Sequence, residues 1–292
     1  MTQAAQSGVN GRPLWRSALV PVLLFAPCVL VYAIFFIWPQ ASLLGLSASD
    51  KAGLTLDHYG RFAGDSYYWD ILGRTLGLGL AVTVITLLLG LPTAYVLARS
   101  QSRWAGFLLL LTTFPLLVSA VVRSFGWMVL FFKDGLVSKA LQSLGLASGP
   151  VQTMYTMPGV IIALAQVLLP LMVLTLHGVF KSIDRDLEYA AMSLGARPSV
   201  ALWLVTLRLA RGGIVAGSLL VFSLAISAFA TPSLVGGARA NVMATAIYEQ
   251  TVELLDWPFG ATLATILLVT VLGLSLAYGA LIEGRDKTEA RP

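Results

Sequence analysis

The chain has 292 residues, of which 57% are hydrophobic and 11% are charged, and its formal net charge is +5. A soluble domain carries about 25% charged residues, so this composition, with a mean hydropathy of +0.82, excludes an ordinary soluble enzyme and indicates a membrane protein. The one cysteine, Cys28, excludes an intrachain disulfide.

Six apolar runs approach the roughly 20 residues that a helix needs to cross a bilayer. Because lipid offers no partners for backbone polar groups, such runs predict helices whose hydrogen bonds are internal. In chain order the runs cover residues 17–38, 72–98, 105–132, 157–180, 212–231 and 257–282. The sequence therefore predicts an all-α integral membrane protein with six transmembrane helices over residues 17–282, an N-terminal tail at 1–16 and a C-terminal tail at 283–292.

Lys and Arg are distributed unevenly between the two sides of this arrangement. With the N-terminus in the cytoplasm, twelve of them fall on the cytoplasmic side and six on the other, and Arg123 lies inside a run. Cytoplasmic segments carry the basic excess, so we expect a multi-pass membrane protein with both termini and the segment 181–211 in the cytoplasm. This bias accounts for the positive net charge and predicts lipid, not nucleic acid, as the surroundings.

The stretch KSIDRDLEYAAMSLGARPSV is unusually polar for this chain. Asp184 is expected to cap a helix whose first turn carries Asp186 and Glu188. Gly195 is expected to end that helix in the left-handed conformation, and Pro198 suits the first turn of the next helix. The pattern predicts two short helices with a surface of small residues that another protein can approach closely.

The segment LEYAAMSLGARPSVALWLVTLRLARGGI resembles the EAA loop of ABC importer permeases, in which E-A-A is followed by three residues, G, nine residues and I-x-L-P. The loop's alanine pair, glycine and leucine match at Ala190, Ala191, Gly195 and Leu207, and the pattern departs at Tyr189, Val205 and Arg208. Glu188, one position before Tyr189, is the candidate for the displaced carboxylate.

Four further segments resemble, in order, the first-subunit permeases of polyamine-type importers. They are LDHYGRF, GRTLGLGLAVTVITLLLGLPTAYVLARS, PLLVSAVVRSFGWMVLFFKDGLVSKALQSLGL and AFATPSLVGG. This resemblance implies a type I ABC importer permease fold with a cytoplasmic coupling-helix loop, in the bacterial cytoplasmic (inner) membrane. The chain would form half of the translocation pathway for a polyamine or related small solute.

The resemblance also implies partners. These are a second permease, expected to be a distinct chain, two ATPase subunits that hold ATP and Mg, and a periplasmic substrate-binding protein. The chain itself lacks the G-x-x-x-x-G-K-[ST] phosphate loop, so no cofactor and no enzymatic activity are assigned to it. The implied contacts with the ATPase lie in the loop at 184–198 and comprise Glu188, Tyr189, Ala190, Ala191, Gly195 and Arg197.

Candidates for the substrate pathway are polar or aromatic residues in or beside the runs. They are Arg123, Trp127, Gln166, Phe229 and Thr231. Arg123 either lines the pathway or snorkels to the outer interface, and Trp127 is more typical of an aromatic belt. Pro232 predicts a break near the outer end of the fifth helix, which either lines a cavity or simply ends the helix.

The segment after the fifth run is acidic, with Glu249, Glu253 and Asp256. These carboxylates either attract a cationic solute or contact a binding protein, or they are the acids left in an outer loop whose basic residues stay inside. His58 and His177 are too far apart in context for a metal site. The alternative function is an ATP-independent secondary transporter, although the chain shows neither an inverted repeat nor an acid deep in a run.

Overall fold

The computed structural model describes residues 25–50, 53–133, 135–145 and 149–289. In this part of the chain four helices are long and apolar enough to cross a membrane, and there are six candidate spans when each of two bent helix pairs is counted as one. The all-α membrane architecture predicted from the sequence is confirmed. The tail predicted at 1–16 and the start of the first run lie outside the described residues.

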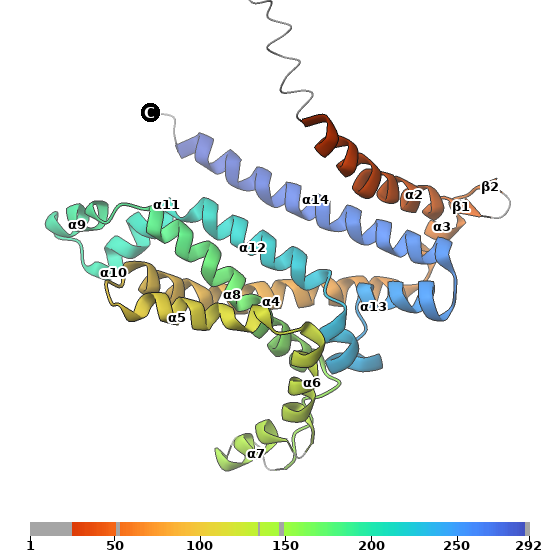
Figure 1. The fold of residues 1–292 in the computed structure, drawn as a ribbon, viewed down its shortest axis with the longest axis horizontal. Helices are drawn as coiled ribbons and strands as arrows, with labels where there is room; N and C mark the ends of the chain where they lie inside the picture. The colour runs from red at the N-terminus through yellow and green to blue at the C-terminus, as the bar shows by residue number, and fades with distance from the viewer. Residues whose placement is uncertain (1–24, 51–52, 134, 146–148, 290–292) are drawn as a thin grey trace, which may run out of the picture.

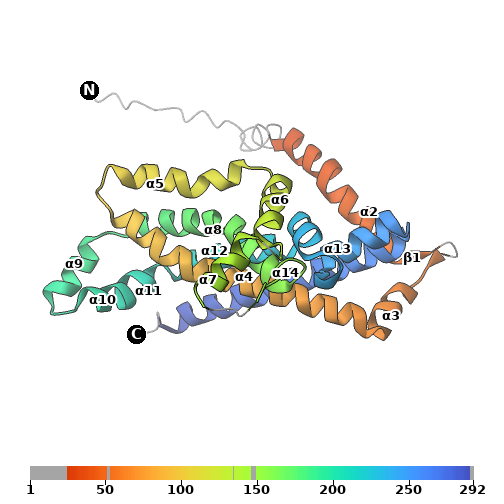
Figure 2. The same ribbon diagram turned by 90° about the horizontal axis from the view of Figure 1, so that it is seen from below.

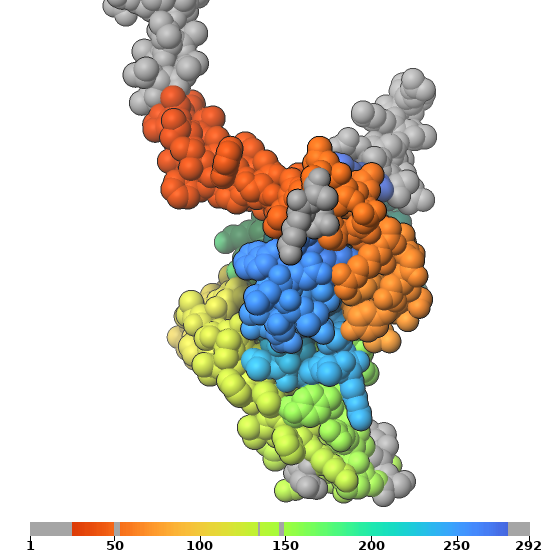
Figure 3. Space-filling view, turned by 90° about the vertical axis from the view of Figure 1, so that its right-hand side faces the viewer, coloured from red at the N-terminus to blue at the C-terminus, as the bar shows by residue number. Residues whose placement is uncertain are grey.

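The first span ends later than its predicted range of 17–38, because the helix continues to Ser47. A π-helical turn, η1 (Ala33–Ile37), leads directly into α2 (Trp38–Ser47), and Pro39 falls in the first turn of α2. The missing N–H of the proline is tolerated there. Figure 3 shows this helix, in red, projecting from the body, so most of its apolar side chains are exposed.

A short hairpin follows, in which β1 (Ser49–Asp50) pairs antiparallel with β2 (Gly53–Leu54). The amphipathic helix α3 (Asp57–Gly64) then leads into the long second span, α4 (Ser66–Arg99). The Asp65 side chain caps α4 by accepting a hydrogen bond from the Tyr67 amide. Because of this cap, α4 begins six residues before the predicted start at residue 72.

The centre of the fold is a packed group of α4, α8 (Met157–Ser182) and α12 (Arg211–Ile226), which run side by side in Figure 1. Its buried side chains form the main hydrophobic core. The helices approach closely at small residues: a Cβ added to Gly90 would lie 2.9 Å from Met172 Cγ, and one added to Gly213 would collide with Val179. The ranges predicted for the second and fourth spans are confirmed to within six residues.

The third predicted span, 105–132, is not one helix. It consists of α5 (Trp104–Thr113), the 3₁₀ turn η2 (Phe114–Leu117) and α6 (Ala120–Phe131), followed by α7 (Leu136–Ser143). The two halves meet at 95°. Pro115 lies in the first turn of η2, and Ser119 is non-helical at φ −52° and ψ 137°, so the chain turns where its apolar composition gives no sign of a bend.

The fifth predicted span, 212–231, is also altered at both ends. The short elements α10 (Pro198–Ala201), η3 (Leu202–Thr206) and α11 (Leu207–Leu209) precede α12 with a bend of 68°. The far end of α12 is Ile226, and the non-helical residues 227–229 come before Pro232, not at it. Pro232 instead occupies the first turn of the π-helical η4 (Pro232–Gly236), where its missing donor costs little.

The chain then forms η5 (Gly237–Ala240), α13 (Met243–Tyr248) and a second π-helical turn, η6 (Glu249–Glu253). The last helix, α14 (Trp257–Glu289), runs past the predicted boundary at 282, so most of the expected C-terminal tail is helical. Figure 2 shows α9 and α10 at one end of the molecule and β1 at the other, with α13 in the half away from α9.

Candidate functional site

The loop predicted to couple to an ATPase contains the helix α9 (Asp186–Ser193), at the extreme end of the molecule in Figure 1. The Asp184 side chain accepts a hydrogen bond from the amide of Asp186, the first residue of α9. At the other end Gly195 has φ +94°, and the amides of Ala196 and Gly195 donate to the carbonyls of Ala191 and Met192. This is a Schellman termination, and both predicted helix signals are therefore present.

A polar cluster attaches α9 to the rest of the fold. The Glu188 carboxylate accepts hydrogen bonds from Arg99 Nη2 at 2.5 Å, Thr206 Oγ1 at 2.6 Å and Tyr95 Oη at 3.2 Å. Arg99 Nη1 also donates to the carbonyl of Ile183 at 2.9 Å. The cluster joins α9 to the end of α4 and to η3, which leads into α12.

The cluster is shielded from water, since the Arg99 and Glu188 side chains are only 12% and 14% exposed. Burial favours the neutral form of the carboxyl, but hydrogen bonds from Thr206 and Arg99 and the charge of Arg99 outweigh it, so the pKa of Glu188 lies below its ordinary value. Glu188 is therefore ionised at neutral pH and faces inward. Sequence reasoning included it among the exposed contacts because spacing alone does not reveal its buried partner on α4.

The other predicted contact residues lie outward or at the edge of α9. The exposed ones are Tyr189, Ala190, Gly195 and Arg197, and Ala191 is half-buried. Leu194, which the motif did not single out, is 91% exposed, more than any other large apolar side chain described. An exposed leucine beside an exposed tyrosine and two small residues forms an apolar face suited to a protein groove.

The candidates for the substrate pathway do not form a single site. Arg123 Nη1 donates to the Pro115 carbonyl at 2.7 Å, which joins the two halves of the bent third span. Trp127 stacks on Phe131 with ring centroids 4.7 Å apart. Snorkelling to the outer interface would require the third span to be one straight helix up to Arg123, and the 95° bend before Ala120 interrupts it.

The remaining candidates are separated between two environments. Thr231 is buried, with its hydroxyl 3.4 Å from that of Ser124, and Gln166 is half-buried with no hydrogen-bond partner for its Oε1. Phe229 instead packs against Tyr248, with ring centroids 4.8 Å apart and the rings tilted. Phe229 therefore belongs to a different surface, at the end of the molecule opposite α9.

The three carboxylates of the acidic segment lie in two different environments. Asp256 forms a salt bridge with Arg61 at 2.9 Å and accepts a hydrogen bond from the Phe259 amide near the start of α14, so its role is structural. Glu249 and Glu253 line a polar cavity of about 300 Å³. Within the described ranges no three His, Cys, Asp or Glu residues are grouped so as to hold a metal ion.

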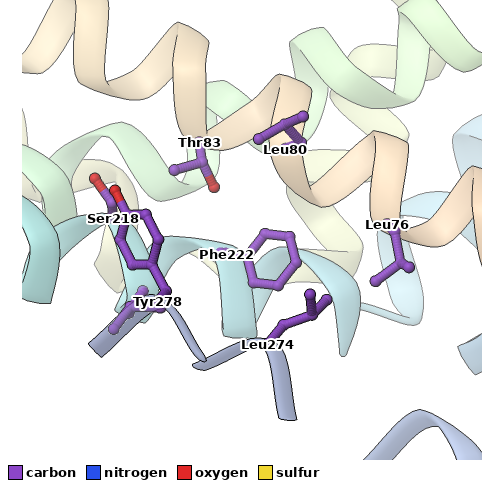
Figure 4. Close-up of a pocket in the computed structure, with 8 residues that line it drawn as sticks. Leu76, Leu80, Thr83, Ser218, Phe222, Leu274 and Tyr278 are labelled. Carbon is purple, nitrogen blue, oxygen red and sulfur yellow. The ribbon is translucent and has the colours of Figure 1, made fainter. Parts of the chain in front are cut away.

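A second cavity, of about 400 Å³, is apolar and lies between α4, α12 and α14 (Figure 4). Its lining residues are Leu76, Leu80, Thr83, Ser218, Leu219, Phe222, Leu274 and Tyr278. The Thr83 hydroxyl is already bonded to the Gly79 carbonyl. Because no charged residue lines it, this open cavity (the apolar groove) offers apolar surface to lipid or protein rather than a site for an ionic solute.

Comparison with known proteins settles the family. The model of the family described as "Binding-protein-dependent transport system inner membrane component" matches residues 84–281, more than half of the chain. The chain belongs to this family. It is a permease subunit of an ABC importer, not an enzyme, and the ATPase is a separate subunit, which decides against the ATP-independent alternative.

Curated relatives and solved structures agree with this assignment. The chain is 33% identical over 250 residues to the spermidine/putrescine transport system permease protein PotB of Escherichia coli strain K12, covering 83% of this chain and 90% of that protein. It is 29% identical over 263 residues to the molybdenum transport system permease protein ModB of Mycobacterium tuberculosis strain H37Rv, covering 90% and 91%.

The fold matches a chain of a bacterial ABC transporter involved in the import of alginate, with a TM-score of 0.73 at 18% identity, covering 92% of this chain and 97% of that one. At this identity the match shows the type I importer permease fold alone. A second structure of an alginate transporter, in complex with a pentasaccharide-bound periplasmic protein, matches with a TM-score of 0.74 at 19% identity, covering 91% and 95%.

Proposed function

We propose that the exposed face of α9 docks into a groove of an ATPase subunit and transmits its movement to the membrane helices. The observation that carries this proposal is the combination of an apolar outer face, including Tyr189 and Leu194, with a buried ionic attachment through Glu188. A docking element must be exposed toward its partner and rigidly held by its own subunit, and α9 meets both requirements.

The polar cluster connects α9, through η3, to α12, which runs toward the opposite end of the membrane domain. Glu188 binds Thr206 in η3, which continues through the 68° bend into α12. Buried residues along α12, including Val221 and Ile226, pack in the core, so a displacement of α9 is carried by a stiff helix to the break at residues 227–229. Rigid-body movement of this kind is how closure of a partner would switch access between the two sides.

In the assembly that we propose, this chain pairs with a second permease, and two ATPase subunits, which hold ATP and Mg, bind the pair from the cytoplasm. A periplasmic protein delivers the substrate, as the family description and the alginate complex support. Both termini and α9 lie on the cytoplasmic side, in agreement with the distribution of basic residues. The exposed α2 and the apolar groove provide surface for the second permease and lipid.

The solute that we propose is a polyamine or a related small cation. The identity to the spermidine/putrescine permease of Escherichia coli, 33%, exceeds the 29% identity to the molybdenum permease over comparable lengths. In addition, Glu249 and Glu253 line the polar cavity of about 300 Å³, and neither carboxylate forms a salt bridge within the described part of the chain.

Association with the ATPase tests the docking proposal. The tagged chain is co-expressed with its neighbouring subunits, and the amount of ATPase that co-purifies is compared between wild type and Leu194→Asp. The control is Leu54→Asp, since Leu54 is 89% exposed on β2, at the other end of the molecule. We expect at least tenfold loss of ATPase with the first variant only. Equal retention in both variants would contradict docking through α9.

A further inference from the structure

The cavity of about 300 Å³ at the end opposite α9 is built by four successive elements. Its lining residues are Phe229, Ser233, Gly237, Ala238, Asn241, Thr245, Tyr248, Glu249 and Glu253. They come from the break after α12 and from η4, η5, α13 and η6, which Figure 1 places far from α9. The volume is at the lower end of the range for small-molecule sites.

Two carboxylates enter this cavity without a basic partner. Glu249 and Glu253 lie four residues apart on the π-helical turn η6, and both line the cavity. The salt bridges Arg99–Glu188 and Arg61–Asp256 do not involve these carboxylates, and neither carboxylate forms an ion pair with another side chain of the described ranges. Two neighbouring negative charges without a counter-ion attract a cation from solution.

An aromatic pair forms another wall of the cavity. The Phe229 and Tyr248 rings are tilted by 36° with centroids 4.8 Å apart, and both line the cavity beside the carboxylates. An aromatic face attracts an ammonium group within about 6 Å of its centroid. Asn241 also lines the cavity. Its amide nitrogen donates a hydrogen bond to the Tyr67 hydroxyl, and its carbonyl oxygen can act as an acceptor.

The backbone around the cavity is irregular in a way that favours a binding site. Two π-helical turns, η4 and η6, border it, and such turns are frequent at functional sites. Gly237 has φ +53°, and a Cβ added there would lie 2.7 Å from the Tyr155 ring. Irregular backbone at a transporter helix break is retained where it lines a cavity.

We infer that this cavity binds the ammonium group of an aliphatic amine, held by Glu249 and Glu253 and covered by the ring of Tyr248. An anion is disfavoured because the two lining residues that are charged at neutral pH, Glu249 and Glu253, are both acidic. A dedicated divalent-metal site is disfavoured because no three His, Cys, Asp or Glu side chains are grouped within the described ranges. The inference rests on the proposed import function and deepens it by placing the amine on this chain, beside the break that α12 connects to α9.

Equilibrium dialysis of radiolabelled spermidine and putrescine against the purified complex, without the periplasmic protein, tests this site. The variants are Glu249→Gln, Glu253→Gln and the double variant, and the control is Asp70→Asn, an exposed acid of α4 outside the cavity. Because a hydrogen bond to a charged group contributes about tenfold or more in affinity, we expect the Kd to rise about tenfold in each single variant and further in the double variant. The control should match wild type.

Tyr248→Leu provides an independent variant that leaves both carboxylates in place. Loss of the aromatic face should raise the Kd for spermidine by about fivefold. Unchanged Kd in the double variant overturns the inference, as does wild-type binding of molybdate or of Ca²⁺ in place of the amines. Melting temperature and co-purified ATPase, measured on the same samples, show that each variant is folded and assembled.

These measurements also separate the two proposals. If ATPase co-purifies and hydrolyses ATP but amine binding is independent of Glu249 and Glu253, the site assignment fails and the import function stands. If no ATPase associates with wild type, the proposed coupling fails, while amine binding that depends on the two carboxylates still supports the site.

Discussion

Replacement of Glu188 by glutamine is the sharpest test of how α9 is held. The substitution keeps the shape of the side chain but removes the charge that pairs with Arg99, and the guanidinium of Arg99, 12% exposed, is left without its counter-ion. Breaking a fully buried pair costs about 3–5 kcal/mol, whereas exposed pairs contribute about 0–1 kcal/mol. For this largely buried pair, with two further hydrogen bonds to the carboxylate, we expect about 3 kcal/mol.

This cost falls on the attachment of α9, because the main core of α4, α8 and α12 is formed by other residues. The population with α9 detached should therefore rise about a hundredfold, which hydrogen exchange measures as faster exchange at residues 186–193. Asp186→Asn, an exposed acid on the same helix, is the control and should change exchange little. In the double variant Arg99→Met with Glu188→Gln, removal of both charges should restore part of the protection.

Either of two results would refute this reasoning. Protection in α9 that is the same in Glu188→Gln as in wild type would show that the ionic cluster does not hold the helix. Strictly additive effects of the two substitutions would show that Arg99 and Glu188 are not coupled, in spite of their 2.5 Å contact.

Two further predictions follow from single contacts. The pKa of Glu188 in the folded protein lies below its ordinary value of 4.5. The stabilisation of α9 by Glu188 should therefore be complete above pH 4.5 and should be lost as the pH falls through the lower folded pKa. Hydrogen exchange measured between about pH 3 and 6 should show this loss in wild type but not in Glu188→Gln. Gly213→Val should lower the melting temperature by overpacking against Val179, at about 1–3 kcal/mol, whereas Gly212→Val, with nothing within 4 Å of an added Cβ, should retain the wild-type value; equal melting temperatures would mean that the helices separate without cost.

The proposed amine cavity and the α9 attachment lie at opposite ends of the same stiff segment. Thr206 belongs to the α9 cluster, and the break at 227–229 that borders the cavity follows the last turn of α12. A movement imposed on α9 is thereby expected to alter the cavity. Comparing the Kd for spermidine with and without a non-hydrolysed ATP analogue would measure this linkage as a ratio of affinities.

The membrane class, the approximate spans and the signals of the loop could be predicted from the sequence. Long apolar runs must form helices because lipid cannot satisfy the backbone, and Gly195 ends α9 because a left-handed residue is favoured after a helix. These are local consequences of composition and backbone conformation. They do not depend on which helices pack against one another.

Tertiary structure decided the features that depend on distant partners. The bend at Ser119 divides a continuously apolar run, and the fifth helix ends before Pro232, because packing and backbone geometry, not hydropathy, set these points. Glu188 lies inward because Arg99, 89 residues earlier, reaches it, and Asp256 is separated in role from Glu249 because it is paired with Arg61. Electrostatic partners are chosen by proximity in space, and a linear pattern of charges does not contain that distance.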